Sequence, residues 1–345
     1  MGNLGLLGVL LLCAGCVAVP PPLEEQNVNH PAPLLAGPHQ TIELLAGSLS
    51  IAQAQWTSPW HHSALPFDEL LPSWNVTSPG AFRVEVQVQG PELESPWLDL
   101  GGWGAWPVAE LAPTKFAAGK VAIDILELSQ PATQARVRLR ATDATQLDRL
   151  TLCFTDSARL GEHAFGGKQR TVPRLAVPGR RQTDEAPELA PRICSPTSVS
   201  MLLEYRGASQ PTAKVAAELF DVEHDIYGNW NRAVQGAARF GVAGYLTRIN
   251  DWNEVASLLC AGNPLVISIG VKPGQLSGAP YTSTNGHLIV IAGLNGHGQA
   301  DVLDPAVAPG ESCSRFYSLN ELDEVWLRRG GTAYVLGDKS QPGVQ

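Results

Sequence analysis

The stretch Arg-Ile-Cys-Ser-Pro-Thr-Ser-Val, residues 192–199, puts a cysteine directly in front of a helical pattern. Apolar residues continue that pattern through Leu202 and Leu203, and Gly207 offers a C-terminal cap, so we expect a helix to begin at Cys194. The free N–H groups and the positive dipole end of a helix start favour a thiolate, which lowers the pKa of a cysteine there. A structural cysteine is the alternative, and this stretch alone does not separate the two.

A thiolate nucleophile needs a base, and His287 is the histidine whose setting fits that role. It opens an apolar strand over residues 288–292, so we expect it at the rim of a sheet. Asn295-Gly296 is a preferred two-residue hairpin turn, and with that turn His287 lies opposite Asp304. Opposed residues of an antiparallel pair have Cβ atoms about 4.5–5.5 Å apart, so Asp304 would orient His287. One extra residue in the turn would move Asp304 to the other face.

Cysteine, histidine and aspartate in this order form a thiolate–imidazolium arrangement suited to acyl transfer. Three stretches carry a resemblance: Cys-Ser-Pro-Thr-Ser-Val-Ser-Met-Leu-Leu at 194–203, Asn-Gly-His-Leu-Ile-Val at 285–290 and Val-Leu-Asp-Pro-Ala at 302–306. With them, the region from 182 to about 336 resembles the bacteriocin-processing-like cysteine peptidases of the papain superfamily, the C39-like peptidases.

The resemblance implies a papain-like fold and a role for each residue. Cys194 would be the nucleophile, His287 the general base and later general acid, and Asp304 the residue that holds His287. In that superfamily a glutamine upstream of the cysteine donates to the oxyanion, and Gln182 is the candidate here. The backbone N–H of Cys194 would be the second donor, and removing one such donor costs about 2.7–4 kcal/mol of transition-state stabilisation.

We therefore predict a hydrolase that cleaves peptide or amide bonds of a peptide or protein substrate through a Cys-His-Asp triad and a thioacyl-enzyme intermediate. Two alternatives stay open: an acyltransferase that uses the same triad, and a non-catalytic surface- or glycan-binding protein. No cysteine or histidine spacing indicates a metal site, and we predict no cofactor. The net charge of −9 provides no general field for phosphate backbones, so nucleic acid is not an expected partner.

Residues 41–155 have a different periodicity, because apolar and polar side chains alternate along them. The alternation is clear at 82–88, 121–125, 135–139 and 150–154. It predicts an antiparallel β-sandwich, which is the N-terminal half of an α+β protein whose second half is the papain-like domain. Six of the nine tryptophans fall in this half. We expect them to fill its core and loop bases, with sugar or surface binding as the alternative.

Residues 182–340 are expected to place helices first and an antiparallel sheet second. Asp251 with Glu254, and Ser318 with Glu321, have the spacing of capping boxes at helix starts. The predicted helices follow Cys194, cover about 212–220, 229–240 and 251–260, and begin again at Ser318; the predicted strands are Leu265–Val271, His287–Leu294, Ala300–Asp304 and Ala333–Leu336.

The first 19 residues have a pattern that predicts a targeting signal. The apolar run from Leu4 to Val19 is short for a membrane-spanning helix and right for a secretory signal. Leu-Cys-Ala-Gly-Cys at 12–16 resembles a bacterial lipoprotein signal, in which Cys16 is lipidated; ordinary cleavage near Ala18 and a retained anchor are the alternatives. We predict an exported protein, either a lipoprotein anchored to the membrane of a bacterial cell envelope or a secreted one.

The length of 345 residues suggests about two domains. We predict a Pro-rich tether over 20–40 and a Pro- and Arg-bearing linker over 156–181. Hydrophobic residues make up 44% of the chain and charged residues 17%, which excludes a disordered chain. Outside the signal and Cys194, the cysteines are Cys153, Cys260 and Cys313, and a disulfide between two of them stays open.

Overall fold

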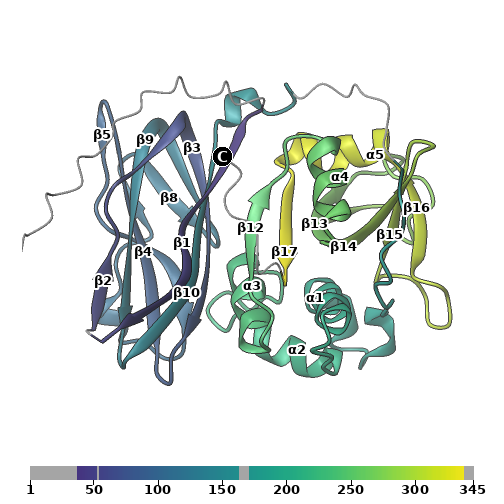
Figure 1. Ribbon diagram of the computed structural model, residues 1–345, viewed down its shortest axis with the longest axis horizontal. Helices are drawn as coiled ribbons and strands as arrows, with labels where there is room; N and C mark the ends of the chain where they lie inside the picture. The colour runs from purple at the N-terminus through teal and green to yellow at the C-terminus, as the bar shows by residue number, and fades with distance from the viewer. Residues whose placement is uncertain (1–36, 53, 163–170, 338–345) are drawn as a thin grey trace, which may run out of the picture. The chain divides into compact units, whose positions relative to one another are not determined.

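The computed structural model describes residues 37–52, 54–162 and 171–337, and its strands form two antiparallel sheets (Figure 1). The first sheet has ten strands: β1 (His39–Ile51), β2 (Gln55–Thr57), β3 (His61–Thr77), β4 (Phe82–Gly90), β5 (Leu93–Glu94), β6 (Leu98–Trp103), β7 (Lys115–Phe116), β8 (Gly119–Ala122), β9 (Ile125–Ala141) and β10 (Thr145–Thr155). The second has seven: β11 (Thr171–Val172), β12 (Gly244–Arg248), β13 (Leu265–Val271), β14 (Thr284–Asn295), β15 (Gln299–Leu303), β16 (Ser314–Ser318) and β17 (Thr332–Leu336).

Five α-helices accompany the second sheet in the described part of the chain. They are α1 (Cys194–Tyr205), α2 (Thr212–Leu219), α3 (Trp230–Arg239), α4 (Trp252–Cys260) and α5 (Leu319–Val325). Short 3-10 helices are η1 (Val108–Glu110), η2 (Ser157–Arg159), η3 (Gln182–Asp184), η4 (Ala190–Arg192) and η5 (Leu327–Arg329). Among the described residues no helix is both long and apolar enough to cross a membrane.

The first sheet runs in the order β1-β10-β3-β9-β4-β5, with every pair antiparallel. Alternate side chains such as Val84 and Val86 on β4 and Val137 and Leu139 on β9 are buried in one core, as their period of two predicts. The antiparallel part of the prediction is confirmed. The strands are hydrogen-bonded into one sheet, and its division into two facing sheets stays a prediction.

The prediction of one continuous strand from the alternation over 121–125 is wrong. β8 ends at Ala122 and β9 begins at Ile125, so the chain reverses between them. Asp124 N donates to Ala122 O at 2.8 Å, and Ile123 lies at the apex with φ of +63°. The side chain of Ile123 is 42% exposed instead of facing the core.

The six tryptophans divide into two groups, so neither interpretation holds for all of them. Trp74 is buried, and Trp56 and Trp103 pack against the first core while partly exposed. The other three stack on guanidinium groups that project from alternate positions of β9: Arg136 lies over Trp60 and Trp97, Arg138 over Trp97 and Arg140 over Trp106. Each of these three rings therefore has a cationic partner within the sheet, and binding of a sugar or surface by them stays a prediction.

The second sheet runs in the order β12-β17-β13-β14-β15-β16, and β11 pairs with β14. Both of its faces are covered, because alternate side chains on β13 and β14 enter two different cores. Val266 and Val290 pack with α1, α2 and α3, whereas Ile267 and Ile289 pack with α4 and α5. Figure 1 shows these two groups of helices on opposite sides of the sheet.

β12 is the edge strand that the sequence analysis missed, and side chains of the first sheet cap its outer N–H groups. Gly244 N donates to Asn75 Oδ1, and Leu246 N donates to Ser73 Oγ, both at 2.9 Å. Next to them Gln235 of α3 brackets Val76, accepting from its N–H and donating to its carbonyl. Since an uncovered edge strand is a template for aggregation, the first sheet protects the second.

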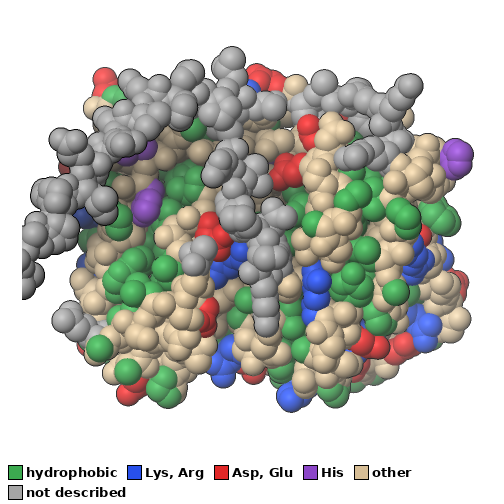
Figure 2. All heavy atoms as spheres, viewed as in Figure 1, with side chains coloured by type: hydrophobic (Ala, Val, Ile, Leu, Met, Phe, Trp, Pro, Cys, Tyr) green, Lys and Arg blue, Asp and Glu red, His purple; other side chains and the backbone are tan. Residues whose placement is uncertain are grey.

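The junction between the two sheets, where β10 and β3 of the first sheet meet β12 of the second, also contains apolar contacts, because the two faces of β10 enter different cores. Leu150, Leu152 and Phe154 enter the first core, while Cys153 packs into the core that contains α1. The described residues of both sheets belong to one compact unit. Figure 2 shows acidic and basic side chains interspersed over the visible face of the molecule.

Several predicted boundaries differ from the structure. Within the predicted linker of 156–181, β11 already pairs with β14, and within the predicted tether of 20–40 the strand β1 begins at His39. The signal residues 1–19, with Cys16, lie outside the described residues. Asp251 caps α4 by accepting from the N–H groups of Asn253 and Glu254, as expected.

The predicted capping box of Ser318 with Glu321 is wrong. Ser318 precedes α5 but makes no side-chain hydrogen bond to the helix. The carboxylate of Glu321 accepts from the N–H and hydroxyl of Ser277 instead, so it ties the loop after β13 to α5.

Candidate active site

Cys194 is the first residue of α1, as the sequence predicts, and its side chain is half-buried. Helix α1 is covered on all sides from Ser195 to Leu203. Its small hydroxyl residues make this close packing possible, because each hydroxyl finds a partner: Ser198 Oγ donates to Leu288 O of β14 at 3.0 Å, and Ser195 Oγ lies 3.3 Å from Tyr334 Oη. These contacts hold the first turns of α1 against β14 and β17.

His287 and Asp304 meet as predicted. His287 Nε2 donates to Asp304 Oδ1 at 2.8 Å, and both side chains are buried. Because Nε2 is bonded to the carboxylate, the other ring nitrogen, Nδ1, is left for the sulfur of Cys194. The hydrogen bond of His287 to Cys194 contributes to the shifted pKa of both groups.

The register that led to this prediction was wrong, although the contact is right. A two-residue turn would set Leu294 opposite His297, whereas Leu294 pairs with Ala300. The turn is longer because Asn295 Oδ1 accepts from the N–H groups of both His297 and Gln299. This displaces the pairing by three positions, an odd number that would put Asp304 on the wrong face.

A register shift between Ile291 and Gly293, of the kind that a β-bulge produces, reduces this displacement by one position, so that Val290 pairs with Leu303. The carbonyl of Ala292, between them, instead accepts from Leu175 N at 2.9 Å. The net displacement of two positions keeps Asp304 on the face of His287, one diagonal step away. Turn and bulge therefore compensate each other.

Two tyrosines that the sequence analysis missed complete the surroundings of Asp304. Tyr281 and Tyr317 donate their hydroxyls to Asp304 Oδ2 at 3.0 and 2.8 Å, and Ala306 N donates to Oδ1 at 2.9 Å. The ring of Tyr281 also packs edge-on against the ring of His287, with centroids 4.9 Å apart. Neither tyrosine had a signal in the sequence, because one lies in an irregular loop and the other on β16, a strand that the alternation did not predict.

The electrostatics favour a charged pair. Burial raises the pKa of the Cys194 thiol, but the hydrogen bond and charge of His287, together with the N–H groups of Leu288 and Ser195, lower it by more. Burial lowers the pKa of His287, but the hydrogen bonds with Asp304 and Cys194 and the negative charges of both groups together raise it by more. A lowered thiol pKa and a raised imidazole pKa define a pH interval in which thiolate and imidazolium coexist.

Gln182 lies in η3 and is buried at the same end of the sheet. Its backbone N–H donates to Pro305 O at 2.9 Å, which ties it to the residue after Asp304. Its side-chain nitrogen donates to Ala190 O at 2.8 Å, and its Oε1 has no partner. One of its two amide N–H bonds is thus committed to the chain, and the other is left for a ligand.

The remaining cysteines of the described residues are free thiols in different settings. Cys153 and Cys313 are buried, and Cys260 is exposed. Burial raises the pKa of the Cys153 and Cys313 thiols. Cys194 is therefore distinguished by its shift toward the thiolate.

Comparisons with known proteins fit this geometry. Residues 174–334 match the model of the Peptidase_C39 like family, and residues 34–152 match the model of a Peptidase C39 N-terminal domain. Fold and family together define a cysteine-type peptidase, a hydrolase. More particularly, the region 174–334 belongs to the C39-like peptidase family.

Two solved structures are similar to about half of the chain. One is a double glycine motif protease from an AMS/PCAT transporter in complex with the leader peptide, at 20% identity and a TM-score of 0.33, covering 48% of this chain and 96% of that chain. The other is the peptidase domain of Streptococcus ComA, a bi-functional ABC transporter, at 14% identity and a TM-score of 0.31, covering 49% and 98%. No curated protein matches the chain.

Proposed function

We propose that this protein is an exported cysteine peptidase in which Cys194, His287 and Asp304 act as a catalytic triad. The observation that carries the proposal is the buried His287–Asp304 hydrogen bond of 2.8 Å beside a helix-start cysteine whose pKa is lowered. The substrate is a peptide or protein, and the bond cleaved is a peptide or amide bond.

In the acylation half of the reaction, the thiolate of Cys194 attacks the carbonyl carbon of the substrate and forms a C–S bond. The carbonyl electron pair moves to oxygen, which the N–H of Cys194 and the free amide N–H of Gln182 stabilise. When the oxyanion collapses, the C–N bond breaks, and His287 gives its proton to the departing amine. The product is a thioester on Cys194 and a neutral imidazole.

In the second half, neutral His287 takes a proton from water, and the resulting hydroxide attacks the thioester carbonyl. The C–S bond breaks, the acid product leaves, and thiolate and imidazolium are restored. Asp304 keeps Nε2 of the ring protonated throughout, so that Nδ1 exchanges the proton. Tyr281 and Tyr317 hold the carboxylate of Asp304 in the plane this requires.

Alkylation tests the nucleophile and has a control within the chain. At pH 6, iodoacetamide is expected to modify Cys194 at least about tenfold faster than the exposed Cys260, because only a thiolate reacts. Peptide mapping by mass spectrometry locates the adduct. Equal, slow labelling of both cysteines would contradict the proposal.

Activity is tested by profiling peptides cut by the protein and by Cys194→Ala. We expect Cys194→Ala to lose cleavage by about 10³-fold or more, while Cys260→Ala keeps it. The new termini reveal whether the cut falls at peptide bonds. Cleavage that survives in Cys194→Ala would contradict the triad.

Export and anchoring are a separate part of the proposal. We propose that Cys16 is lipidated and that the protein is held at a bacterial envelope membrane, supported by the lipoprotein-like stretch at 12–16. The first sheet would be a sandwich that positions the peptidase near a surface or glycan. Mass spectrometry of the mature N-terminus, with Cys16→Ser as control, tests this: a mature chain that starts elsewhere and carries no lipid would exclude anchoring.

A further inference from the structure

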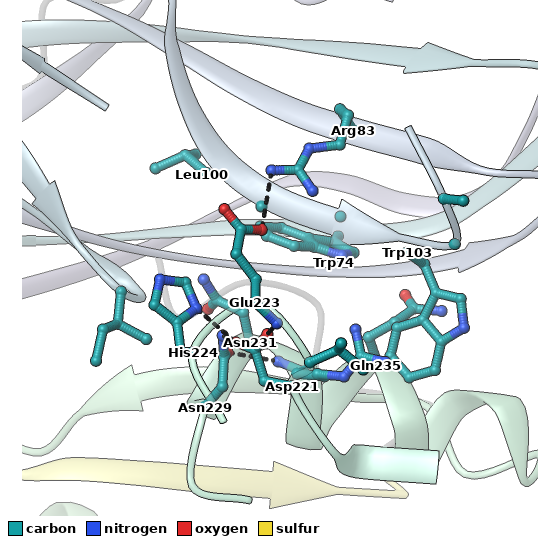
Figure 3. Close-up of a pocket in the computed structure, with 17 residues that line it drawn as sticks. Trp74, Arg83, Leu100, Trp103, Asp221, Glu223, His224, Asn229, Asn231 and Gln235 are labelled. Carbon is teal, nitrogen blue, oxygen red and sulfur yellow. Dashed lines mark hydrogen bonds and ion pairs between the residues drawn. The ribbon is translucent and has the colours of Figure 1, made fainter. Parts of the chain in front are cut away.

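A cavity of about 430 Å³ lies where the first sheet meets the turn after α2 and the start of α3 (Figure 3). The first sheet contributes Trp74, Arg83, the segment 100–105 and Ile123, and the peptidase region contributes the segment 221–224 and α3 residues. A volume of this size is within the range of ligand sites, roughly 300–1,000 Å³.

Most polar groups of this cavity are already bonded to each other, which makes the walls rigid. Figure 3 shows Asp221 at the centre of one such group, with Oδ2 accepting from His224 Nδ1 and from Asn229 Nδ2. Arg83 pairs with Asp99 and, at 3.7 Å, with Glu223. These charges largely cancel, so the site does not select a strongly charged ligand.

Three polar atoms of the cavity-lining residues have no partner. They are Trp74 Nε1, Asn231 Oδ1 and Arg232 Nε, among eight such buried atoms in the described residues. Trp74 is 3% exposed and Asn231 2% exposed, so water does not freely compensate them. The two nitrogens are donors that need an acceptor, and Asn231 Oδ1 is an acceptor that needs a donor. One amide group of a ligand offers both, a carbonyl oxygen and an N–H.

The rim of the cavity is apolar and strained. Ile123 is a β-branched residue at φ +63°, in a tight turn closed by Asp124 N and Ala122 O, a backbone conformation that β-branched residues rarely adopt. The turn is held because Asp124 accepts from Trp230 N at 2.9 Å and from the Asn231 side chain. The result is an exposed isoleucine at the mouth of the cavity.

Val222 provides a second exposed apolar side chain at the same cavity, and it belongs to the peptidase region. It is 79% exposed, which makes it one of the four large exposed hydrophobic residues in the described chain, and Ile123 is another. The turn that carries Val222 is linked to the active site, because Arg192, two residues before Cys194, donates to the carbonyl and the carboxylate of Asp225.

We propose that this cavity binds a segment of the peptide substrate away from the scissile bond, seating an apolar side chain against Ile123 and Val222 and a backbone amide in the polar wall. The inference rests on the proposed function in taking the substrate to be a peptide. It adds that the first sheet takes part in substrate recognition through Ile123.

Binding is measured with the Cys194→Ala protein, which holds the site without cutting. The probes are acetylated tetrapeptide amides, Ala-Leu-Ala-Ala and Ala-Ser-Ala-Ala, followed by titration calorimetry and by changes in tryptophan fluorescence. We expect the leucine peptide to bind at least about tenfold more tightly, because it alone carries a large apolar side chain to bury in the cavity.

Two variants in the same background place the binding at the cavity. Ile123→Gly relieves the strained turn and removes the apolar side chain, so we expect it to raise the melting temperature and yet weaken binding of the leucine peptide about tenfold. Val222→Ser should weaken binding similarly. Val108→Ser is the matched control, because Val108 is 82% exposed and lies outside the cavity; it should change nothing.

The proposal is overturned if both tetrapeptides bind alike, if Ile123→Gly and Val222→Ser bind the leucine peptide as well as Val108→Ser does, or if only a saccharide such as N-acetylglucosamine binds. The last result would assign the cavity to glycan. None of these outcomes touches the triad, which fails only if Cys194→Ala still cleaves, so the two proposals fail separately.

Discussion

Two buried aspartates of this protein have pKa values that are shifted in opposite directions. Asp304 at the active site is fully buried, and burial raises its pKa. The hydrogen bond and charge of His287, together with the hydrogen bonds from Ala306 N and Tyr317, lower it by more, so the net pKa is lowered. Asp124 at the junction is 8% exposed, and burial raises its pKa to about 6, with the hydrogen bond from Trp230 N opposing only part of the effect.

The difference lies in the donors, not in the depth. Asp304 accepts from His287, Ala306 and two tyrosines, and one of these donors can carry a positive charge. Asp124 has the N–H of Trp230 as the neutral donor to its carboxylate. A buried carboxylate thus stays ionised where the fold supplies charged and multiple donors, and otherwise it keeps its proton to higher pH. This contrast suggests matched substitutions at the two sites.

The largest expected effect is that of Asp304→Asn. An amide preserves the shape but favours the wrong protonation of His287, so kcat should fall about 10³–10⁴-fold. Steady-state kinetics on a cleaved peptide measures it. Asp301→Asn, which changes a nearby carboxylate bonded to Arg174, is the control and should keep kcat within about threefold. A comparable loss in both variants would mean that charge in general, not the Asp304 contact, supports the activity.

The next effect concerns stability at the junction. Asp124→Ala leaves the first N–H of α3 without its partner, and this should lower the free energy of unfolding by about 1–3 kcal/mol. Asp124→Asn keeps an acceptor oxygen there and should cost clearly less. Urea unfolding at pH 7 compares them. If the two variants lose the same amount, the hydrogen bond to α3 is not what stabilises this junction.

The two sites also differ in how far the sequence could predict them. Cys194 at the helix start and His287 at the strand start follow from local periodicity, and Asp304 follows from the hairpin that joins two adjacent strands. The longer turn and the bulge of this hairpin could not be predicted from the sequence. The contact between His287 and Asp304 was still predicted correctly, because the turn and the bulge together shift the register by an even number of positions. Local patterns sufficed for residues whose positions are set within one or two elements.

The junction could not be predicted, because it is made of side chains from strands far apart in the chain. Ser73 and Asn75 show only polar residues within a strand, and nothing in them indicates the distant edge strand β12 that they cap. Ile123 was misassigned for a different reason. A β-branched residue in an alternating run predicts a strand, whereas tertiary contacts of Asp124 impose a turn that isoleucine disfavours.

A smaller kinetic effect is expected when one tyrosine of the active site is changed. Tyr317→Phe removes one of the two hydroxyl donors to Asp304 Oδ2, which leaves the carboxylate less well held, so kcat should fall about tenfold with KM unchanged. Tyr281→Phe should act alike, and the double variant more than either. Stopped-flow or steady-state assays separate kcat from KM. A change confined to KM would assign the tyrosines to substrate binding instead.

The last effect is the pH dependence of stability, and it distinguishes the two aspartates most directly. The pKa of Asp124 is raised to about 6 in the folded chain, from 3.8. Between these values the folded state binds a proton that the unfolded chain has lost, so stability must fall as pH rises through this window, by up to about 3 kcal/mol.

Asp124→Asn cannot ionise, so the free energy of unfolding of the wild type should decline relative to this variant between pH 4 and pH 7. Glu254, whose pKa is raised to about 7, contributes the same sign to both proteins and cancels in the difference. At Asp304 the sign reverses, because a lowered pKa makes the ionised form the stabilising one. Urea unfolding at half-unit steps of pH measures the difference. A constant gap between wild type and Asp124→Asn would show that the junction carboxylate is solvated as well as an exposed one.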